Sequence, residues 1–218
     1  MRITVFGASG AIGRLFVNLA LKEGHQVHQY SRKKEGLPQS ENARVFTGEL
    51  TDYARIKEAI SGTDAVVSFL GPALKRSYPG TPIATGHEHI IRAMKEKGVS
   101  RFITIATPAV RFEKDRTSVA TVLPKVMARL FLPKPYQEIM AVGELTKSSG
   151  LDWTVVRFIA PVDGEPTGTV KVTFGDQKVG FKITRTDIAA FVLGDWSNVN
   201  LSAQCQSLAV NKIDFIQE

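Results

Sequence analysis

Short apolar runs and helix-like segments alternate along most of the chain. The apolar runs are rich in β-branched residues, as strands are, and they cover residues 2–6, 25–30, 43–47, 64–70, 101–106 and 151–158. Helical patterns lie between or after these runs, over residues 11–23, 53–60, 85–98 and 135–149. Strands that alternate with helices favour parallel pairing, because each helix returns the chain to the same edge of the sheet. The pattern therefore predicts an α/β fold with a doubly wound parallel sheet.

The pattern becomes less regular after residue 160. Two short strands, a capped helix and a last strand are expected there, over 168–172, 179–183 (with Gly175-Asp176 in the turn between these two), 188–193 (capped by Thr186-Asp187) and 205–210. We therefore expect a single domain over residues 1–218. Its core would cover about residues 1–160, and a small lobe with the last strand would cover about 161–218.

Length and composition suit an ordinary globular domain. The chain has 218 residues, a net charge of +7 and a single cysteine, Cys205, so an internal disulfide is excluded. No apolar run reaches the roughly 20 residues that a membrane-spanning helix needs, and the first run is too short for a signal peptide. We expect a cytoplasmic protein. The positive charge suits an anionic ligand, and no arginine-rich tail, zinc-ligand spacing or aromatic-basic motif favours nucleic acid.

The first predicted strand leads directly into a glycine-rich turn. The stretch Gly7-Ala8-Ser9-Gly10-Ala11-Ile12-Gly13 has the spacing G-x-x-G-x-x-G, and the first predicted helix starts within it. Glycine allows a tight turn and a close approach of the backbone, while the helix N-terminus offers free N–H groups and a positive dipole end. Ser9 adds a hydroxyl donor. The alternative is an ordinary turn with glycines for packing, but a strand before it and a helix after it favour a dinucleotide pyrophosphate.

The end of the second predicted strand bears on which dinucleotide fits. A site for NAD places an acidic residue about 20 residues after the glycines, where it binds the ribose 2′-hydroxyl. Here the sequence reads Ser31-Arg32-Lys33, without an acidic residue. Arg32 and Lys33 would instead bind a 2′-phosphate, and Arg14 is a further candidate for it. We therefore expect NADP(H), and the alternative is a solvated basic loop.

Further candidates follow the third and fourth predicted strands. Leu50 lies after the third strand, where it would contact an adenine ring. Phe69, Leu70 and Gly71 end the fourth strand, at the carboxyl edge where ligands of such sheets bind.

Two histidines and an apolar, basic stretch complete the candidates. His87 and His89 are two residues apart on a predicted helix, so they face different sides and do not form a metal pair. We interpret them as surface or packing residues and expect no metal. Residues 122–132 are expected to form a helix against the mouth of the site, with a membrane-surface helix as the alternative.

Six stretches carry a family resemblance, and they are VFGASGAIG, YSRKK, GELTD, DAVVSFLG, GLDWTVVR and ITRTDIA. Together they resemble the atypical short-chain dehydrogenases, in particular the NAD(P)H-binding group that includes biliverdin-IXβ (flavin) reductase and the NmrA-like proteins. The resemblance implies a Rossmann-type fold with a substrate-side C-terminal lobe. It places Gly7, Ser9, Gly10, Ile12 and Gly13 at the pyrophosphate of NADP(H) and Arg32 at the 2′-phosphate. It also implies that the nicotinamide end is lined by Phe69, Leu70, Gly71, Ala106, Thr107, Phe158, Ile159, Ala160 and Pro161.

The chain departs from the classical members of that family at the catalytic positions. Their Tyr-x-x-x-Lys pair serves as acid and base, because the lysine lowers the pKa of the tyrosine. Here Tyr136 is followed four residues later by Met140, and Thr107 replaces the usual serine after the fifth strand. Thr107 and Tyr136 are the catalytic candidates that are left. Tyr136 and Lys134 would close the pocket, and the alternative is that Tyr136 only starts its helix.

A nicotinamide site without the tyrosine–lysine pair favours direct hydride transfer between stacked rings, which depends more on positioning than on acid–base chemistry. We expect an NADPH-dependent oxidoreductase that reduces a flat or conjugated small-molecule acceptor, such as a flavin, quinone or tetrapyrrole. The second hypothesis is a non-enzymatic NADP(H) sensor of the NmrA-like kind. A third, a nucleotide-sugar epimerase or dehydratase, is disfavoured by the missing pair. The sequence is compatible with a monomer or a dimer.

Overall fold

The structure, a computed structural model, describes residues 1–112, 115, 126–168, 170–173, 182–194 and 206–209. The predicted turn at Gly175-Asp176 and the single cysteine, Cys205, lie outside these residues.

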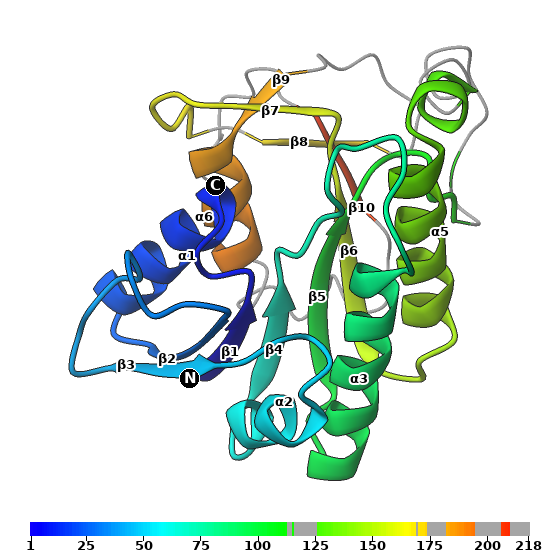
Figure 1. The fold of residues 1–218 in the computed structure, drawn as a ribbon. Helices are drawn as coiled ribbons and strands as arrows, with labels where there is room; N and C mark the ends of the chain where they lie inside the picture. Colours follow the sequence, from blue (N-terminus) through cyan, green and yellow to red (C-terminus); the bar gives the residue numbers. More distant parts are fainter. Residues whose placement is uncertain (113–114, 116–125, 169, 174–181, 195–205, 210–218) are drawn as a thin grey trace.

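The predicted doubly wound parallel sheet is confirmed. Within the described residues the main sheet has eight strands in the order β3-β2-β1-β4-β5-β6-β10-β8, and all neighbours are parallel except β10 and β8 (Figure 1). The strands are β1 (Arg2–Phe6), β2 (Gln26–Ser31), β3 (Ala43–Thr47), β4 (Ala65–Ser68), β5 (Arg101–Ala106), β6 (Asp152–Arg157), β8 (Lys171–Thr173) and β10 (Gln206–Ala209). The order reverses between β1 and β4, which is the switch point where ligands of such sheets bind.

Helices cover both faces of this sheet. One face carries α1 (Ala11–Lys22) and α6 (Arg185–Gly194), and the other carries α2 (Tyr53–Ile60), α3 (Pro82–Lys97) and α5 (Pro133–Lys147) (Figure 1). Neighbouring strand residues point to opposite faces. Accordingly Ile3 and Val5 belong to the apolar cluster beneath α1 and α6, whereas Phe6 belongs to the cluster beneath α2 and α3.

Three helix starts differ from the prediction. Helix α5 begins at Pro133, two residues before the predicted start at residue 135. Helix α3 begins at Pro82 rather than at residue 85, because proline is favoured in the first helical turn, where its missing N–H leaves no hydrogen bond unmade. Helix α6 begins at Arg185, with Thr184 before it instead of Thr186-Asp187. The Thr184 hydroxyl accepts a hydrogen bond from the Asp187 N–H (3.0 Å) and donates to its carboxylate (2.7 Å). The Thr184 hydroxyl therefore caps the first turn of α6.

The two short strands after residue 160 do not form a hairpin. Strand β8 pairs antiparallel with β10 in the main sheet, whereas β9 (Lys182–Thr184) pairs in parallel with β7 (Ala160–Val162), a strand that the sequence pattern did not predict. The local alternation of apolar residues marks strands but does not name their partners. The small β7–β9 sheet lies above the carboxyl ends of the main strands (Figure 1) and corresponds to the predicted C-terminal lobe.

The predicted helix over 122–132 lies partly outside the described residues. Its described part is helical over 126–131. Here Leu130 and Phe131 are 60% and 58% exposed, and Val126 and Met127 are 45% and 46% exposed. These apolar side chains are therefore not packed into the core.

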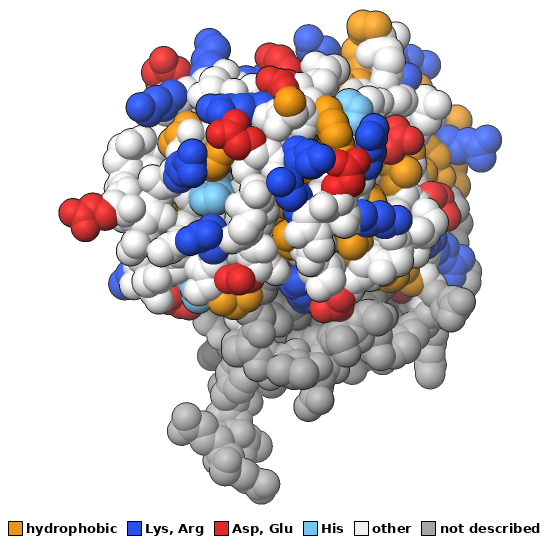
Figure 2. All heavy atoms as spheres, turned by 90° about the horizontal axis from the view of Figure 1, so that it is seen from below, with side chains coloured by type: hydrophobic (Ala, Val, Ile, Leu, Met, Phe, Trp, Pro, Cys, Tyr) orange, Lys and Arg blue, Asp and Glu red, His pale blue; other side chains and the backbone are white. Residues whose placement is uncertain are grey.

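The face at the amino ends of the strands carries charges of both signs. Figure 2 shows this face, with Lys and Arg interspersed among Asp and Glu. Some of these charges are paired, as Arg101 is with Asp152 at the starts of β5 and β6 (3.4 Å), and Lys57 with Glu96 between α2 and α3 (2.6 Å). The candidate site lies at the opposite edge of the sheet.

A buried histidine joins α3 to the central strands. The His87 Nδ1 lies 2.8 Å from the Ile83 carbonyl, which only accepts, so Nδ1 carries the proton. Nε2 then accepts from the hydroxyls of Ser68 (3.0 Å) and Thr104 (3.2 Å), which are register partners on β4 and β5. The Ser68 hydroxyl also accepts from the Leu70 N–H (3.4 Å). This network fixes the end of β4, and it agrees with a packing role for His87.

We predict that His87 makes the protein less stable in acid. Burial lowers the pKa of His87 from 6.5 to about 4. The hydrogen bond to the Ile83 carbonyl and the charge of Glu138 act in the opposite direction, but they are the smaller effects. The unfolded chain therefore takes up a proton at a higher pH than the folded chain does. The unfolding free energy should fall by roughly 3 kcal/mol between pH 6.5 and pH 4 because of this residue, since one pKa unit corresponds to about 1.4 kcal/mol.

Urea unfolding of wild type, His87→Asn and His25→Asn over this pH range tests the prediction. The His87→Asn variant should be less stable at neutral pH but should lose less stability on acidification. The partly exposed His25 is the control. Identical pH dependence in wild type and His87→Asn would contradict the assignment.

Candidate functional site

The turn between β1 and α1 is too tight for side chains at two of its glycines. Gly7 has a φ of +78°, in the left-handed region that favours glycine. A Cβ on Gly13 would lie 2.2 Å from the Gly7 carbonyl oxygen, and a Cβ on Gly7 would lie 3.0 Å from the Phe69 backbone. The Gly10 N–H closes the turn by donating to the Gly7 carbonyl (2.9 Å). The backbone of the turn is therefore held against both its own helix and the end of β4.

The first turn of α1 presents donors and no acid. The N-cap residue Gly10 has no side chain to accept from the first N–H groups, and no acidic residue stands in the first turn. Ser9, Gly10 and Ala11 are exposed, whereas Ala8, Ile12 and Gly13 are buried. An anion at this place would find free N–H groups and the positive end of a twelve-residue helix.

The end of β2 lies beside this turn. The Ser31 hydroxyl donates to the Ser9 hydroxyl (3.3 Å), which joins two of the predicted cofactor residues. Arg32 and Lys33 follow and are exposed. The Arg14 guanidinium lies near Gly36, since a Cβ there would come within 3.7 Å of it. Its position places a third cation next to the loop that follows β2.

These three cations lack anionic partners. Within the residues that the structure describes, the side chains of Arg14, Arg32 and Lys33 form no ion pair. Elsewhere basic residues do find acids, as Arg185 does with Asp163 (2.6 Å). The positive charge is thus free for a ligand at the edge where the glycine turn opens.

Leu50 belongs to the β3–α2 loop and packs against α3. A Cβ on Gly86 would lie 2.8 Å from a Leu50 methyl carbon, so the glycine is what lets α3 come this close. The Leu50 carbonyl accepts from His89 Nδ1 (2.8 Å). His89 therefore anchors this loop. Contact of Leu50 with an adenine ring stays a prediction.

The segments predicted to line the nicotinamide end divide between apolar clusters. Phe69 and Phe158 share one cluster with residues of α1, and the Phe69 ring lies 5.2 Å from that of Phe16. Ala106 belongs to a second cluster, and Leu70 packs against a third. The Phe158 N–H donates to the Ala106 carbonyl (3.3 Å), which ties β6 to the end of β5. The flanking Leu70, Thr107, Ala160 and Pro161 are partly buried, and Gly71 and Ile159 are exposed.

The two catalytic candidates are not joined by any hydrogen bond. Thr107 lies just after β5, and its hydroxyl is without a hydrogen bond in the described part of the chain. Tyr136 lies in the first turn of α5 and is partly buried. Lys134 stands 5.9 Å from the ring centroid of Tyr78. It therefore faces a tyrosine that the sequence did not single out.

Sequence reasoning missed a buried carboxylate beside this tyrosine. Glu138 of α5 is fully buried, and one of its oxygens accepts from the N–H groups of Ile83 (2.7 Å) and Ala84 (2.9 Å) at the start of α3. The Tyr78 hydroxyl lies close to Glu138 but outside hydrogen-bond geometry. Burial, with Glu138 as the second cause, raises the pKa of Tyr78 to about 12. Tyr78 therefore stays protonated and is a poor base.

A signal for Glu138 was present in the sequence. It occupies the buried stripe of α5 together with Val142 and Thr146, at helical spacing. A carboxylate in such a stripe needs a partner, and here the partner is the N-terminus of α3, whose own cap residue Thr81 makes no side-chain hydrogen bond.

The described residues contain no group of three or more His, Cys, Asp or Glu that could hold a metal ion. None of their helices is both long and apolar enough to cross a membrane.

Curated relatives match parts of the chain. Pinoresinol reductase 1 of Arabidopsis thaliana is 26% identical over 166 residues, which cover 71% of this chain and 48% of the relative. Oxidoreductase ordB of Dothistroma septosporum is 32% identical over 120 residues, or 48% of this chain and 44% of the relative. The chain thus spans less than half the length of these relatives.

Solved structures match nearly the whole chain in fold. ChuY of Escherichia coli, described as an anaerobillin reductase, has a TM-score of 0.76 at 21% identity and covers 99% of this chain and 100% of its own. A short-chain dehydrogenase/reductase of Veillonella parvula in complex with NADP has a TM-score of 0.78 at 15% identity, covering 96% and 94%. At these identities the likeness establishes the fold.

The family model described as NAD(P)H-binding matches residues 7–194. This match begins at the first glycine of the β1–α1 turn and ends with α6, so it includes every residue of the candidate site. The chain belongs to the NAD(P)H-binding family.

Proposed function

We propose that this protein is an NADPH-dependent reductase that transfers a hydride to a flat or conjugated small-molecule acceptor, such as a flavin, quinone or tetrapyrrole. The observation that carries the proposal is the glycine turn, where Gly13 leaves no room for a Cβ and α1 opens uncapped beside unpaired cations. A dinucleotide pyrophosphate suits this backbone, because its charge is met by N–H groups and a helix dipole.

The choice of NADPH over NADH rests on the residues after β2. Arg32 and Lys33 are exposed cations without ion-pair partners among the described residues, and Arg14 approaches the same loop. A guanidinium binds a phosphate through two parallel hydrogen bonds, whereas it offers a ribose hydroxyl no matching charge. The NADP complex of the structural neighbour from Veillonella parvula is consistent with this choice.

The residues available for chemistry favour a reaction that needs positioning. Bound NADPH would supply the hydride, and the acceptor would take a proton from solvent to complete a two-electron reduction. Tyr136 lacks the lysine four residues on, and Tyr78 is held protonated by its burial. Thr107, whose hydroxyl has no other partner in the described chain, would orient the acceptor or the nicotinamide amide. Apolar side chains such as Phe69 and Phe158 would exclude water from the stacked rings.

Two relatives support a reductase over other activities of the fold. Pinoresinol reductase 1 matches most of this chain, and the neighbour described as an anaerobillin reductase has the same length and fold. The acceptors of those two proteins are not assigned to this chain. The class of acceptor proposed here follows from the missing tyrosine–lysine pair.

We predict that the purified protein binds NADPH and oxidises it with at least one acceptor of this class. Calorimetry should give saturable binding, and the absorbance of NADPH should fall over time with FMN, menadione or biliverdin. Reactions without protein are the control. Tight NADPH binding with no turnover of any of these acceptors would contradict the reductase and favour the NADP(H)-sensor alternative.

We also predict that Arg32→Ala weakens NADPH binding by roughly 10-fold and leaves NADH binding unchanged, since hydrogen bonds to charged groups contribute about 1.5–3 kcal/mol before solvent screening. Lys95→Ala, which removes an exposed cation from the far end of α3, is the matched control. Calorimetric titration of each variant with both cofactors measures the effect. Equal losses of affinity for NADPH and NADH would show that Arg32 does not bind the 2′-phosphate.

A further inference from the structure

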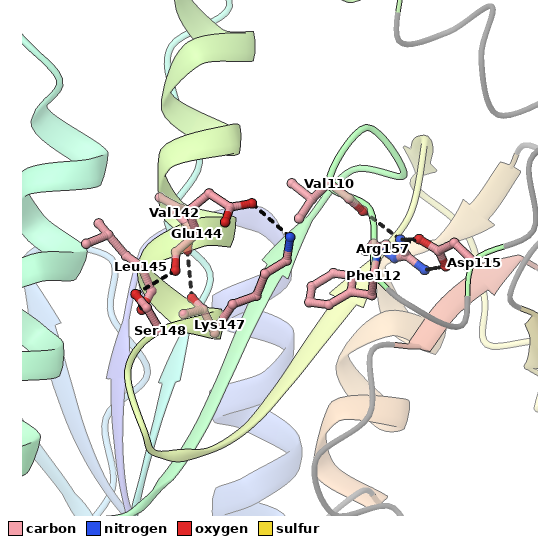
Figure 3. A network of polar contacts seen from close by, with 10 residues as sticks. Val110, Phe112, Asp115, Val142, Glu144, Leu145, Lys147, Ser148 and Arg157 are labelled. Atoms are coloured by element: carbon pink, nitrogen blue, oxygen red, sulfur yellow. Dashed lines mark hydrogen bonds and ion pairs between the residues drawn. The ribbon is translucent and has the colours of Figure 1, made fainter.

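Arg157 is a fully buried arginine at the end of β6. Its guanidinium donates two hydrogen bonds to the Asp115 carboxylate, from Nη1 (2.5 Å) and Nη2 (2.6 Å), and a third from Nη1 to the Val110 carbonyl (2.6 Å) (Figure 3). Its Nε has no partner in the described part of the chain. One side chain of β6 therefore binds the segment after β5 at two points.

Asp115 also binds the backbone of Phe112. Its carboxylate also accepts from the Phe112 N–H (2.8 Å), and its own N–H donates to the Phe112 carbonyl (3.0 Å). The carboxylate thus holds Phe112 and Arg157 at once. Without it the guanidinium would be left buried without its counter-charge.

Helix α5 holds the same segment from the other side. The Phe112 ring lies between the Arg157 guanidinium (5.1 Å) and the Lys147 ammonium group (4.9 Å), as Figure 3 shows. A Cβ on Gly143 would lie 2.5 Å from a Val110 methyl carbon, so α5 reaches Val110 only because residue 143 is glycine. The segment is therefore fixed by a strand and a helix together.

The contacts of Arg157 with Asp115 and Val110 lie directly beside the proposed nicotinamide end. Arg157 is the register partner of Ala106, the last residue of β5. Thr107 follows, and its carbonyl accepts from the Val110 N–H (3.1 Å), which makes Thr107–Val110 one turn. Because Arg157 holds the carbonyl of Val110, it also holds this turn, and Phe158 is its own neighbour in the chain.

We propose that Arg157, held by Asp115, is a positioning residue that sets Thr107 and Phe158 around the nicotinamide ring. This inference rests on the proposed function, because it needs a nicotinamide at that place. A buried ion pair is seldom more stabilising than apolar residues of the same volume, whereas it does define one geometry. The bidentate contact with the carboxylate fixes direction as well as distance.

The first test uses the fluorescence lifetime of NADPH bound to the protein, which reports how firmly the nicotinamide ring is held. Asp115→Asn and Arg157→Lys should shorten this lifetime toward that of free NADPH. Their calorimetric Kd for NADPH should stay within about three-fold of wild type, because the glycine turn and Arg32 are untouched. With an acceptor that the wild type reduces, kcat should fall about 10-fold or more while the KM for NADPH changes little, since misplacement slows the transfer step.

The same two strands offer a matched control. Arg101 and Asp152 form an arginine–aspartate pair at the starts of β5 and β6, whereas Arg157 lies where β6 ends. Asp152→Asn should therefore leave the lifetime and kcat as in wild type. Arg157→Lys keeps a cation beside Asp115, so it tests the bidentate geometry without the loss of charge that Asp115→Asn brings.

The outcomes separate the two proposals. A lower melting temperature with an unchanged lifetime and kcat in Asp115→Asn and Arg157→Lys would mean a purely structural pair and overturn the inference. An equal effect of Asp152→Asn would overturn it too. Failure of the wild type itself to bind NADPH would overturn the proposed function, whereas binding without turnover still leaves the lifetime to decide the role of Arg157.

Discussion

The contact between Gly13 and the Gly7 carbonyl is the constraint on which the rest of the site depends. No other residue type fits at position 13, because even a single methyl carbon would overlap the carbonyl. This contact sets where α1 starts, and Phe16 one turn later reaches the ring of Phe69 at the end of β4. Gly7 in turn lies so near to Phe69 that a Cβ on Gly7 would be 3.0 Å from the Phe69 backbone. One close approach thus places the helix N-terminus, the end of β1 and the end of β4 together.

Charge is distributed differently at the two edges of the sheet. At the amino ends of the strands, acids and bases are mixed and several form pairs, such as Lys57 with Glu96. At the carboxyl ends, Arg14, Arg32 and Lys33 form no ion pair within the described residues. Exposed pairs at the first edge contribute little to stability. Unpaired cations at the second edge raise the local potential for an anion.

The sequence predicted those features that depend on local patterns. The six central strands and the glycine turn follow from short stretches, and the structure contains them. Partners that are distant in the chain were not predictable. Glu138 reaches the N-terminus of α3 from 54 residues away, and Arg157 reaches Asp115 across 42. A buried charge within an apolar stretch signals that a partner exists, but only the fold says which residue it is.

The same reasoning explains what the sequence left open at the C-terminal end. Apolar alternation marked short strands near β8 and β9, with a turn between them, but did not indicate which strands they pair with. The backbone hydrogen bonds of a strand can be met by any free edge, so alternation alone does not choose between neighbours. Strand β9 pairs with β7, which contains Ala160 and Pro161 of the segment predicted to line the nicotinamide end. The proposed acceptor side of the site therefore depends on long-range pairing, which local patterns do not encode.

The most direct test of the central claim is a titration of ¹⁵N-labelled protein with NADP⁺, followed by amide chemical shifts. If the glycine turn holds the pyrophosphate and the β2 end holds the 2′-phosphate, the largest shifts should fall on the amides of residues 7–13 and 31–33. Shifts that concentrate elsewhere on the sheet, or no shifts at saturating NADP⁺, would contradict the account.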